Sequence, residues 1–280
     1  MKRILVPTDF SEEAQNAFEV AIQIAKKTGA AIKLLHVIEM PRTANFSAMG
    51  SVVPRDPNEE IFVIKVMEST RDQIRNMIAQ VEHEGVDIVQ EVDVDTIFNK
   101  INEVVDRDHV DLIVMGSKGS SGIREMLIGS NTEKVVRLAT CPVLTVKHKH
   151  AAFDVKNIVF PSNFDDEAQR LVDQVKMIQE IFDARIHLLY VNTPGTFGSS
   201  DKIQEKMHYF AERFGLHDYT VNVYNDSIEE DGILHFANRI NADLVTMGTH
   251  GRRGIAHLLS GSIAEDLVNH TVKPVLTYHI

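Results

Sequence analysis

Residues 111–119 read Asp111-Leu-Ile-Val-Met-Gly-Ser-Lys-Gly119, a strand-like apolar run that leads into a Gly-x-x-Gly turn. Nine residues further on, Gly129-Ser130 opens a helix-like segment. The same pattern recurs 132 positions later as Asp243-Leu-Val-Thr-Met-Gly-Thr-His-Gly251, followed after nine residues by Gly261-Ser262. A lone Gly-x-x-Gly is weak evidence, because glycine marks turns of many kinds. Two copies in matching strand-to-helix context predict a duplicated nucleotide-binding module, since glycines there let a phosphate approach the backbone.

Outward from the first copy, apolar runs and helical patterns alternate through residues 1–147. Ser11 precedes a helical repeat with Glu12 and Glu13 in its first turn, and Gly29 ends it. We expect strands at residues 3–7, 31–38, 86–92, 111–115 and 142–146, and further helices at residues 58–84, 96–108 and 132–140. Strands that alternate with helices of this length predict parallel strands joined by crossover helices.

The second half of the chain repeats this order. Residues 188–191 align with residues 34–37 at an offset of 154, whereas the glycine segments are offset by 132, so the second copy is 22 residues shorter. The sequence therefore predicts an α/β fold of two similar doubly wound domains, residues 1–147 and residues 154–280, with a linker at residues 148–153. Each domain is expected to hold an open five-stranded parallel sheet with helices on both faces.

Length and composition are those of a globular protein with two ordinary domains. The chain has 280 residues, of which 44% are hydrophobic and 25% charged. Its single cysteine, Cys141, excludes an internal disulfide framework. Because Cys141 lies in an apolar run, we expect a small buried hydrophobic residue rather than a reactive thiol.

The charge balance is acidic in both halves. The net charge is −11, with 17 Lys and Arg against 22 Asp and Glu in residues 1–147, and 12 against 18 in residues 148–280. Without a basic block, we expect no nucleic-acid partner. The start of the chain runs directly into a strand, and no apolar run approaches the ~20 residues of a membrane span. We therefore expect a cytoplasmic protein with no membrane partner.

In parallel α/β sheets, ligands bind beyond the carboxyl ends of the strands. The carboxylate of Asp9 suits ribose hydroxyls or, through water, a metal ion, and it suits equally the capping of the helix that follows. Backbone N–H groups after Gly129 would point at a phosphate. The residues expected at this edge are Pro7, Thr8, Asp9, Val37, Gly116, Gly129, Ser130 and Asn131.

The chain resembles tandem members of the universal stress protein family over essentially its whole length. In the first half the resemblance is carried by Val6-Pro-Thr-Asp9, Leu35-His-Val37, the glycine segment, and the closing strand Cys141-Pro-Val-Leu-Thr-Val146. In the second half it is carried by Leu189-Tyr-Val191, the second glycine segment and Lys273-Pro-Val-Leu-Thr-Tyr278.

This resemblance implies an adenine nucleotide alpha hydrolase-like fold that binds ATP or AMP, with Mg²⁺ or Mn²⁺ left open as an accompanying ion. It also implies that the two closing strands pair antiparallel between the domains, and it leaves a homodimer open. The nucleotide contacts expected in the first domain are Pro7, Thr8, Asp9, Val37, Gly116, Lys118, Gly119, Gly129, Ser130 and Asn131. Those expected in the second are Pro161, Ser162, Asn163, Val191, Gly248, Gly251, Arg252, Gly261 and Ser262.

The second copy departs from the family pattern at Asn163, which stands where the first copy has Asp9. Asparagine still accepts a hydrogen bond but loses the charge, which is worth about 1–2 kcal/mol per bond. Arg252 and Arg253 can offset this loss by attracting phosphate. We expect tighter nucleotide binding in the first domain.

Three classes of function follow. The first is a nucleotide-dependent regulator in the stress response, as the resemblance implies. The second is an enzyme that hydrolyses ATP slowly at most, because the sequence has neither a Walker-type phosphate loop nor the Ser-Gly-Gly-x-Asp-Ser loop of ATP-pyrophosphatases. The third is an interaction module whose pockets are empty or hold an apolar ligand.

The 13 histidines raise the question of a metal site. His148 and His150 flank a lysine in the expected linker, without cysteines or carboxylates at familiar ligand spacing. We expect no metal to be held by protein side chains alone.

Overall fold

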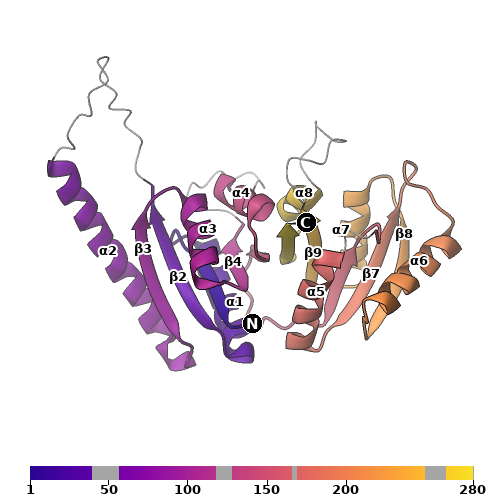
Figure 1. Cartoon of the computed structure of the whole chain (residues 1–280), viewed down its shortest axis with the longest axis horizontal. Helices are drawn as coiled ribbons and strands as arrows, with labels where there is room; N and C mark the ends of the chain where they lie inside the picture. Colours follow the sequence, from indigo (N-terminus) through magenta and orange to yellow (C-terminus); the bar gives the residue numbers. More distant parts are fainter. Residues whose placement is uncertain (40–56, 118–127, 166–168, 250–262, 280) are drawn as a thin grey trace, which may run out of the picture.

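The computed structural model describes residues 1–39, 57–117, 128–165, 169–249 and 263–279. Strands and helices alternate along the chain, and the two halves lie side by side (Figure 1). The first half contains β1 (Arg3–Pro7), α1 (Glu12–Thr28), β2 (Ala31–Ile38), α2 (Pro57–Val81), the 3₁₀ turn η1 (Glu82–Glu84), β3 (Ile88–Val94), α3 (Ile97–Asp108), β4 (Leu112–Gly116), α4 (Ser130–Leu138) and β5 (Val143–Val146). The second half contains β6 (Asn157–Pro161), α5 (Gln169–Phe182), β7 (Arg185–Asn192), α6 (Ser200–Arg213), β8 (Tyr219–Asn225), α7 (Glu229–Arg239), β9 (Leu244–Thr249), α8 (Ile263–His270) and β10 (Val275–His279).

Helix α1 begins and ends at the predicted residues. The Ser11 side chain caps its start by accepting a hydrogen bond from the backbone N–H of Ala14. Gly29 ends it in the left-handed conformation, with φ of 72°, and donates its N–H to the carbonyl of Ala25. Residues with a side chain adopt that φ only rarely, so glycine is favoured there.

The strands form one sheet in the order β3-β2-β1-β4-β5-β10-β9-β6-β7-β8. Within each half the five strands run parallel, as in the pairing of Arg3 with Ala31 and of Asn157 with Arg185. The predicted α/β fold with two similar doubly wound halves is confirmed. Strand order reverses next to the first strand of each half, where β4 and β9 lie. That reversal is the place at which such sheets bind ligands.

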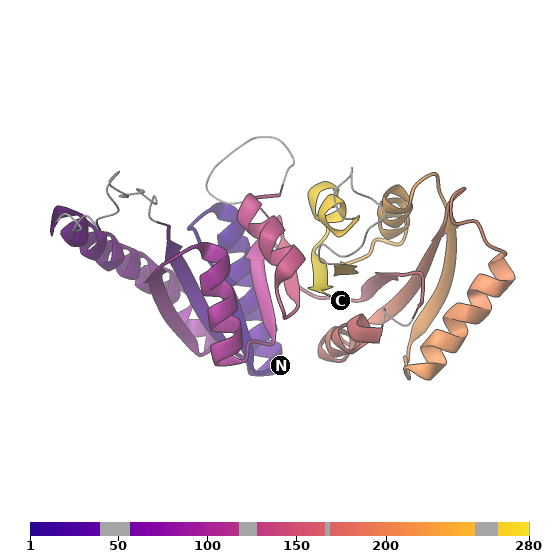
Figure 2. The same cartoon turned by 45° about the horizontal axis from the view of Figure 1, so that its top comes forward.

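Helices cover both faces of the sheet (Figure 2). One face carries α1 and α2 together with α5 and α6, and their apolar side chains belong to one continuous core. The other face carries α3 and α4 in the first half and α7 and α8 in the second, over two smaller cores. Strand residues alternate between these cores, since Ile4 and Val6 face the first and Leu5 faces the second.

The halves meet through their last strands. β5 and β10 pair antiparallel, with Leu144 opposite Leu276. Two threonines bond across this pair in a symmetric way: Thr145 Oγ1 donates to the carbonyl of Val275, and Thr277 Oγ1 donates to the carbonyl of Val143. The pairing makes the two five-stranded sheets continuous.

The segment expected as a linker, residues 148–153, packs on both halves. Gln23 of α1 donates from Nε2 to the carbonyl of His150 (3.3 Å) and accepts at Oε1 from the N–H of Phe153 (2.6 Å). The Phe153 ring is buried and meets Phe182 of α5 edge-on, at 5.6 Å between ring centroids. The segment is therefore tied to α1 and α5 by specific contacts.

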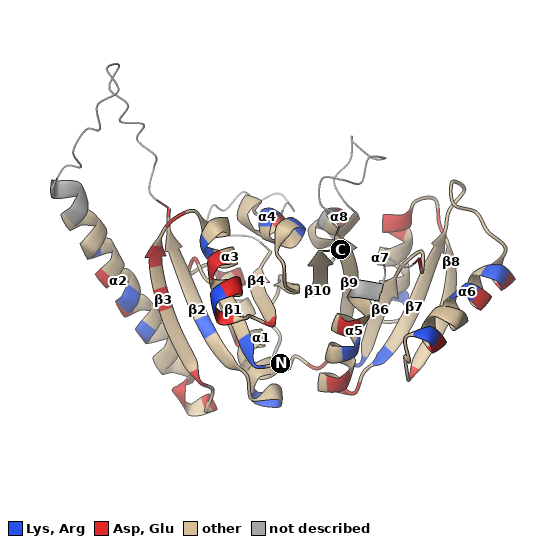
Figure 3. Cartoon of the chain, in the orientation of Figure 1, with Lys and Arg blue, Asp and Glu red and all other residues tan. Residues whose placement is uncertain are grey.

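A cluster of charged side chains, the Lys100 cluster, joins β2, β3 and α3 in the first half. The ammonium of Lys100, whose side chain is 5% exposed, contacts Asp93 (2.6 Å), Glu103 (2.9 Å) and Glu91 (3.3 Å). Glu91 also pairs with Lys33 (2.9 Å) and Arg107 (2.6 Å). Figure 3 shows acidic and basic residues close together on α3. The outer part of this half therefore depends on ion pairs as well as on apolar packing.

Three predicted elements in the first half differ from the structure by two or more residues at an end. The helix expected at residues 132–140 spans residues 130–138. The helix expected to reach residue 84 ends as an α-helix at Val81 and continues as η1, which Gly85 closes with φ of 71°. The strand expected at residues 86–92 spans residues 88–94. The register of this strand with β2, in which Ile32 lies beside Ile88, sets its first and last residues. The local apolar pattern alone does not predict them.

Among the described helices, none is both long and apolar enough to cross a membrane.

Candidate functional site

The turn after β1 is held by three hydrogen bonds. The N–H of Thr8 donates to the carbonyl of Leu35 (2.8 Å), which ties the turn to β2. The N–H of Phe10 donates to Thr8 Oγ1 (3.1 Å), and the N–H of Ser11 donates to Asp9 Oδ1 (3.0 Å). Asp9 therefore orders the turn, while Ser11 caps α1. Phe10 has a positive φ of 65°, which a bulky residue adopts only where its surroundings enforce it.

The turn after β6 repeats this arrangement 154 residues later. The N–H of Ser162 donates to the carbonyl of Leu189 (3.0 Å), and the N–H of Phe164 donates to Ser162 Oγ (2.8 Å). The N–H of Asp165 donates to Asn163 Oδ1 (3.3 Å), and Phe164 has φ of 58°. The two turns are thus copies in geometry as well as in sequence.

The two turns differ, however, in the chemical groups that their side chains present. Asn163 Nδ2 donates to Asp165 Oδ2 (2.7 Å), and Asp165 Oδ1 contacts the ammonium of Lys206 (2.5 Å). Asp165 occupies the place of the capping residue Ser11 of the first turn. The second turn therefore presents an amide that donates to a neighbouring carboxylate, and the first presents the carboxylate of Asp9, which accepts from the N–H of Ser11.

The end of β2 lies next to the first turn. Pro7 pairs with Leu35, so Asp9 and Val37, each two residues further on, reach the same edge of the sheet. His36 hydrogen-bonds through Nδ1 to the carbonyl of Thr8 (2.8 Å) and stacks on Phe10 at 4.8 Å between ring centroids. These contacts give His36 a structural role in fixing the turn.

The end of β7 is more covered than the end of β2. Val191 is 8% exposed, and Gly232 in the first turn of α7 lies against it. A Cβ added at Gly232 would come within 2.4 Å of Val191 Cγ1. Tyr190, in the place of His36, donates its hydroxyl to the carbonyl of Thr196 (3.1 Å), in the segment that follows β7.

The end of β4 carries Gly116, for which the structure gives a packing reason. A Cβ built there would lie 2.8 Å from the backbone carbon of Glu13 and 3.0 Å from the backbone nitrogen of Ala14. Glycine at this position thus lets the first turn of α1 approach β4. The sequence pattern suggests room for a ligand, and it cannot distinguish that role from close packing.

Gly116→Ala is expected to lower the free energy of unfolding by about 2 kcal/mol, because the added methyl group meets backbone atoms that cannot rotate away. Chemical denaturation followed by circular dichroism measures this. Gly198→Ala is the matched control: its Cβ would meet only the side chain of Ile203, at 3.1 Å, and a change below about 0.5 kcal/mol is expected. A Gly116→Ala protein as stable as the wild type would contradict the packing role.

Helix α4 begins beside the end of β4. Gly129 donates its N–H to the carbonyl of Ser117 (2.9 Å), and it is the N-cap of α4 with φ of −66° and ψ of 142°. As a glycine, this N-cap residue has no side chain with which to cap the helix. The first N–H groups of an α-helix have no partner within the helix, and together with the helix dipole they attract anions. The exposed Ser130 and the half-buried Asn131 occupy the first turn.

The described residues of the first predicted site therefore lie at one edge of the sheet, on β1, β2, β4 and α4. Those of the second, Pro161, Ser162, Asn163, Val191 and Gly248, lie at the ends of β6, β7 and β9. The remaining predicted contacts are outside the described residues: Lys118, Gly119, Gly251, Arg252, Gly261 and Ser262.

Sequence reasoning missed the roles of Gly232 and Ser117. A glycine in the first turn of a helix signals little by itself, although its conflict with Val191 is clear once the structure is known. Ser117 lies inside the quoted glycine segment, but its burial at 1% exposure depends on its place directly after β4, where its N–H donates to the carbonyl of Val146 in β5.

Neither cysteine nor histidine chemistry marks a site in the described ranges. Burial, together with the nearby Asp111 and Asp106, raises the pKa of Cys141 to about 12, so its thiol stays protonated and unreactive. No group of three or more His, Cys, Asp or Glu side chains in those ranges is placed to hold a metal ion.

Comparison with known proteins gives a consistent result. The model of the universal stress protein family matches the chain twice, over residues 1–147 and 154–279. A universal stress protein of Methanocaldococcus jannaschii is 32% identical over 146 residues, which cover 52% of this chain and 82% of the relative. One from Synechocystis is 22% identical over an alignment of 303 residues that covers 99% of this chain and all of the relative. The crystal structure of a universal stress protein from Archaeoglobus fulgidus shares the fold, with a TM-score of 0.75 and 21% identity over 99% of this chain and 98% of that one.

Proposed function

Since this chain belongs to the universal stress protein family, we propose that it binds an adenine nucleotide, ATP or AMP, at the edge formed by β1, β2 and β4. The bound nucleotide makes the protein a ligand-dependent regulator of the stress response, and the protein acts in the cytoplasm. One observation carries the proposal: α4 starts next to β4 at a glycine N-cap, which has no capping side chain, and β4 is the direct neighbour of the strand that ends in the Asp9 turn. An anion-binding helix start and a carboxylate at one edge suit the phosphates and the ribose of a single ligand.

In the first half, different residues contact the phosphates, the ribose and the adenine. The N–H groups at the start of α4, with Gly129, Ser130 and Asn131, receive the phosphates. Asp9 accepts hydrogen bonds from the ribose hydroxyls, and Val37 offers apolar contact to the adenine. A ligand that binds the folded state stabilises it and shifts its conformational equilibrium, which is how binding becomes a signal to a partner.

A divalent ion would be held mostly by the nucleotide itself. Mg²⁺ in nucleotide sites takes one or two carboxylates together with phosphate oxygens and water. Asp9 is the carboxylate at this edge that suits such a role, directly or through water.

Native mass spectrometry of the purified full-length chain tests the proposal. We expect a co-purified adenine nucleotide, and calorimetric titration of the stripped protein with ATP and with AMP should give a dissociation constant in the micromolar range, about 1–100 μM. Release of phosphate during the titration reports any slow ATPase activity. Absence of binding at about 1 mM nucleotide would contradict the proposal and favour a pure interaction module.

The two halves should differ in affinity because Asp9 and Asn163 differ. Asp9→Asn is expected to weaken binding to the first half about tenfold, through loss of a charge-assisted hydrogen bond. Asn163→Asp alone would place two carboxylates together, because Asn163 now donates to Asp165. The double variant Asn163→Asp, Asp165→Ser recreates the first turn and is expected to strengthen binding to the second half. Calorimetry resolves the two sites, and an unchanged first site in Asp9→Asn would contradict the role of Asp9.

The division into folding units is also a proposal. Residues 1–147 and 154–280 are taken as the two domains, and the β5–β10 pairing is taken to hold them together in solution. Amide hydrogen exchange checks this pairing: the N–H groups of β10 should exchange as slowly as those of β4. Exchange of β10 at the rate of a loop would mean that the halves separate.

A further inference from the structure

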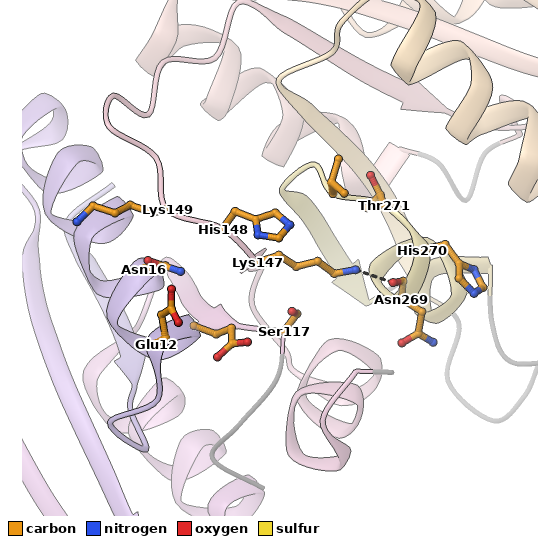
Figure 4. A pocket seen from close by; sticks show the side chains of 11 residues that line it. Glu12, Asn16, Ser117, Lys147, His148, Lys149, Asn269, His270 and Thr271 are labelled. Carbon is orange, nitrogen blue, oxygen red and sulfur yellow. Dashed lines mark hydrogen bonds between the residues drawn. The ribbon is translucent and has the colours of Figure 1, made fainter. Parts of the chain in front are cut away.

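A cleft of about 320 Å³ lies between the two halves (Figure 4). One wall is the start of α1, with Glu12, Glu13 and Asn16. Residues 147–149 form a second wall of the cleft, and residues 269–272 at the end of α8 line it from the second half. Ser117 also lines the cleft. Its size is at the lower end of the range for small-molecule sites, about 300–1,000 Å³.

One deeply buried polar atom at this cleft has no hydrogen-bond partner among the described residues. Ser117 is 1% exposed, and its Oγ is buried without a partner there. Asn16, which is 5% exposed, also lines the cleft. Buried polar groups without partners are rare and costly, so each calls for an explanation such as a ligand.

The corresponding place in the second half shows what normally satisfies such a group. Thr249 stands 132 residues after Ser117, at the end of β9, and it is equally buried at 1% exposure. Its Oγ1 donates to the carbonyl of Val136 in α4, across the junction, at 3.4 Å. Ser117 has no such bond to α8 in the described residues, because the cleft lies there instead. The junction is therefore symmetric in its strands and asymmetric in its polar contacts.

The walls of the cleft carry both signs of charge. Glu12 and Glu13 supply carboxylates from α1. Lys147 supplies an ammonium group from the other side, where it donates to the carbonyl of Asn269 (2.6 Å). The Lys149 side chain is 70% exposed and extends over α1, where it contacts Glu19 at 3.4 Å (Figure 4).

We propose that this cleft binds a small zwitterion, an α-amino acid. The ammonium of the ligand lies toward Glu12 and Glu13, and its carboxylate lies toward Lys147 on the opposite side. Ser117 Oγ and the amide of Asn16 supply hydrogen bonds between these poles. A ligand here touches both halves and the segment that joins them, so its binding couples to their arrangement. The proposed nucleotide site uses other side chains, although Ser117 directly follows Gly116 and its carbonyl accepts from Gly129 of that site.

Ligand-observed NMR and calorimetry on the full-length chain test this, with the standard L-amino acids offered one at a time. We expect at least one to bind with a dissociation constant below about 1 mM. The amine and the carboxylic acid that each carry only one pole of that amino acid should bind at least about tenfold more weakly. The proposal is overturned if none binds at about 10 mM, or if the amine alone binds as tightly.

A matched pair of variants separates ligand binding from folding. Ser117→Ala should weaken the amino acid about five- to tenfold without lowering the melting temperature, because it removes a hydroxyl that has no partner in the folded chain. Thr249→Val, which removes the bonded counterpart, should lower the melting temperature and leave amino-acid affinity unchanged. ATP affinity should stay within about twofold in Ser117→Ala. If ATP affinity falls instead and amino-acid affinity does not, the cleft belongs to the nucleotide pocket and the proposal fails.

Discussion

Gly129→Val is expected to abolish nucleotide binding by the first half, with a loss of affinity of about 100-fold or more, equivalent to about 2.7 kcal/mol. Gly129 is the N-cap of α4, and its φ of −66° and ψ of 142° are open to any residue. The backbone there does not need glycine for its own conformation. A valine side chain would instead occupy the space over the first N–H groups of α4, where the phosphates are proposed to lie.

Calorimetric titration with ATP measures this loss, and thermal unfolding of the same variant supplies the control. Because the N-cap position makes no side-chain hydrogen bond, the substitution should cost about 1 kcal/mol of stability at most. Gly261→Val makes the same change in the second copy and should leave the first site unaffected. Wild-type affinity in Gly129→Val would remove the start of α4 from the site.

Much of the fold follows from local sequence signals. Ser11 and Gly29 mark the two ends of α1 because a capping hydroxyl and a left-handed backbone are local requirements. The offset of 154 between the halves predicts a second turn after β6, and the structure has it with the same pattern of hydrogen bonds. Features that depend only on neighbouring residues could be predicted.

Features that depend on register between distant segments could not be predicted. Gly116 reads as a ligand glycine in the sequence, yet it also faces the backbone of Glu13, more than a hundred residues earlier. The partners of Lys100 come from β3, whose bounds are set by its pairing with β2. No local pattern shows that these side chains meet.

The two halves share the turns and the sheet, but the side-chain contacts of their outer parts differ. Lys100 in α3 corresponds, at the offset of 132, to Gly232 in α7. In the first half this position holds a buried ammonium among carboxylates, and in the second it holds a close contact between a helix and Val191. The two halves therefore reach similar folds with different stabilising interactions, and the first should be the more sensitive to acid.

Lys100→Met is expected to lower the stability of the first half by about 3 kcal/mol at neutral pH, near the lower end for removal of one partner from a buried ion pair. The lower end applies because the Asp93 and Glu103 side chains are 44% and 52% exposed and can regain water. Burial by itself would raise the pKa of Glu91, but hydrogen bonds from Arg107, Lys33 and Lys100 lower it to about 2. A lowered folded-state pKa adds stability above the unfolded value of 4.5, and this contribution is lost as the pH falls from about 4.5 toward 2.

The difference between wild type and Lys100→Met should therefore shrink as the pH falls through that window, because protonated carboxyls no longer need the ammonium. Circular dichroism during urea unfolding measures it at each pH, and hydrogen exchange in β3 and α3 assigns the loss to the first half. Lys156→Met, which removes an exposed lysine that lies 3.4 Å from Asp154, is the control and should change stability by less than about 1 kcal/mol. A cost for Lys100→Met that is the same at pH 7 and near pH 2 would mean that Lys100 acts through the packing of its methylene groups, and the ion pairs would then contribute nothing measurable.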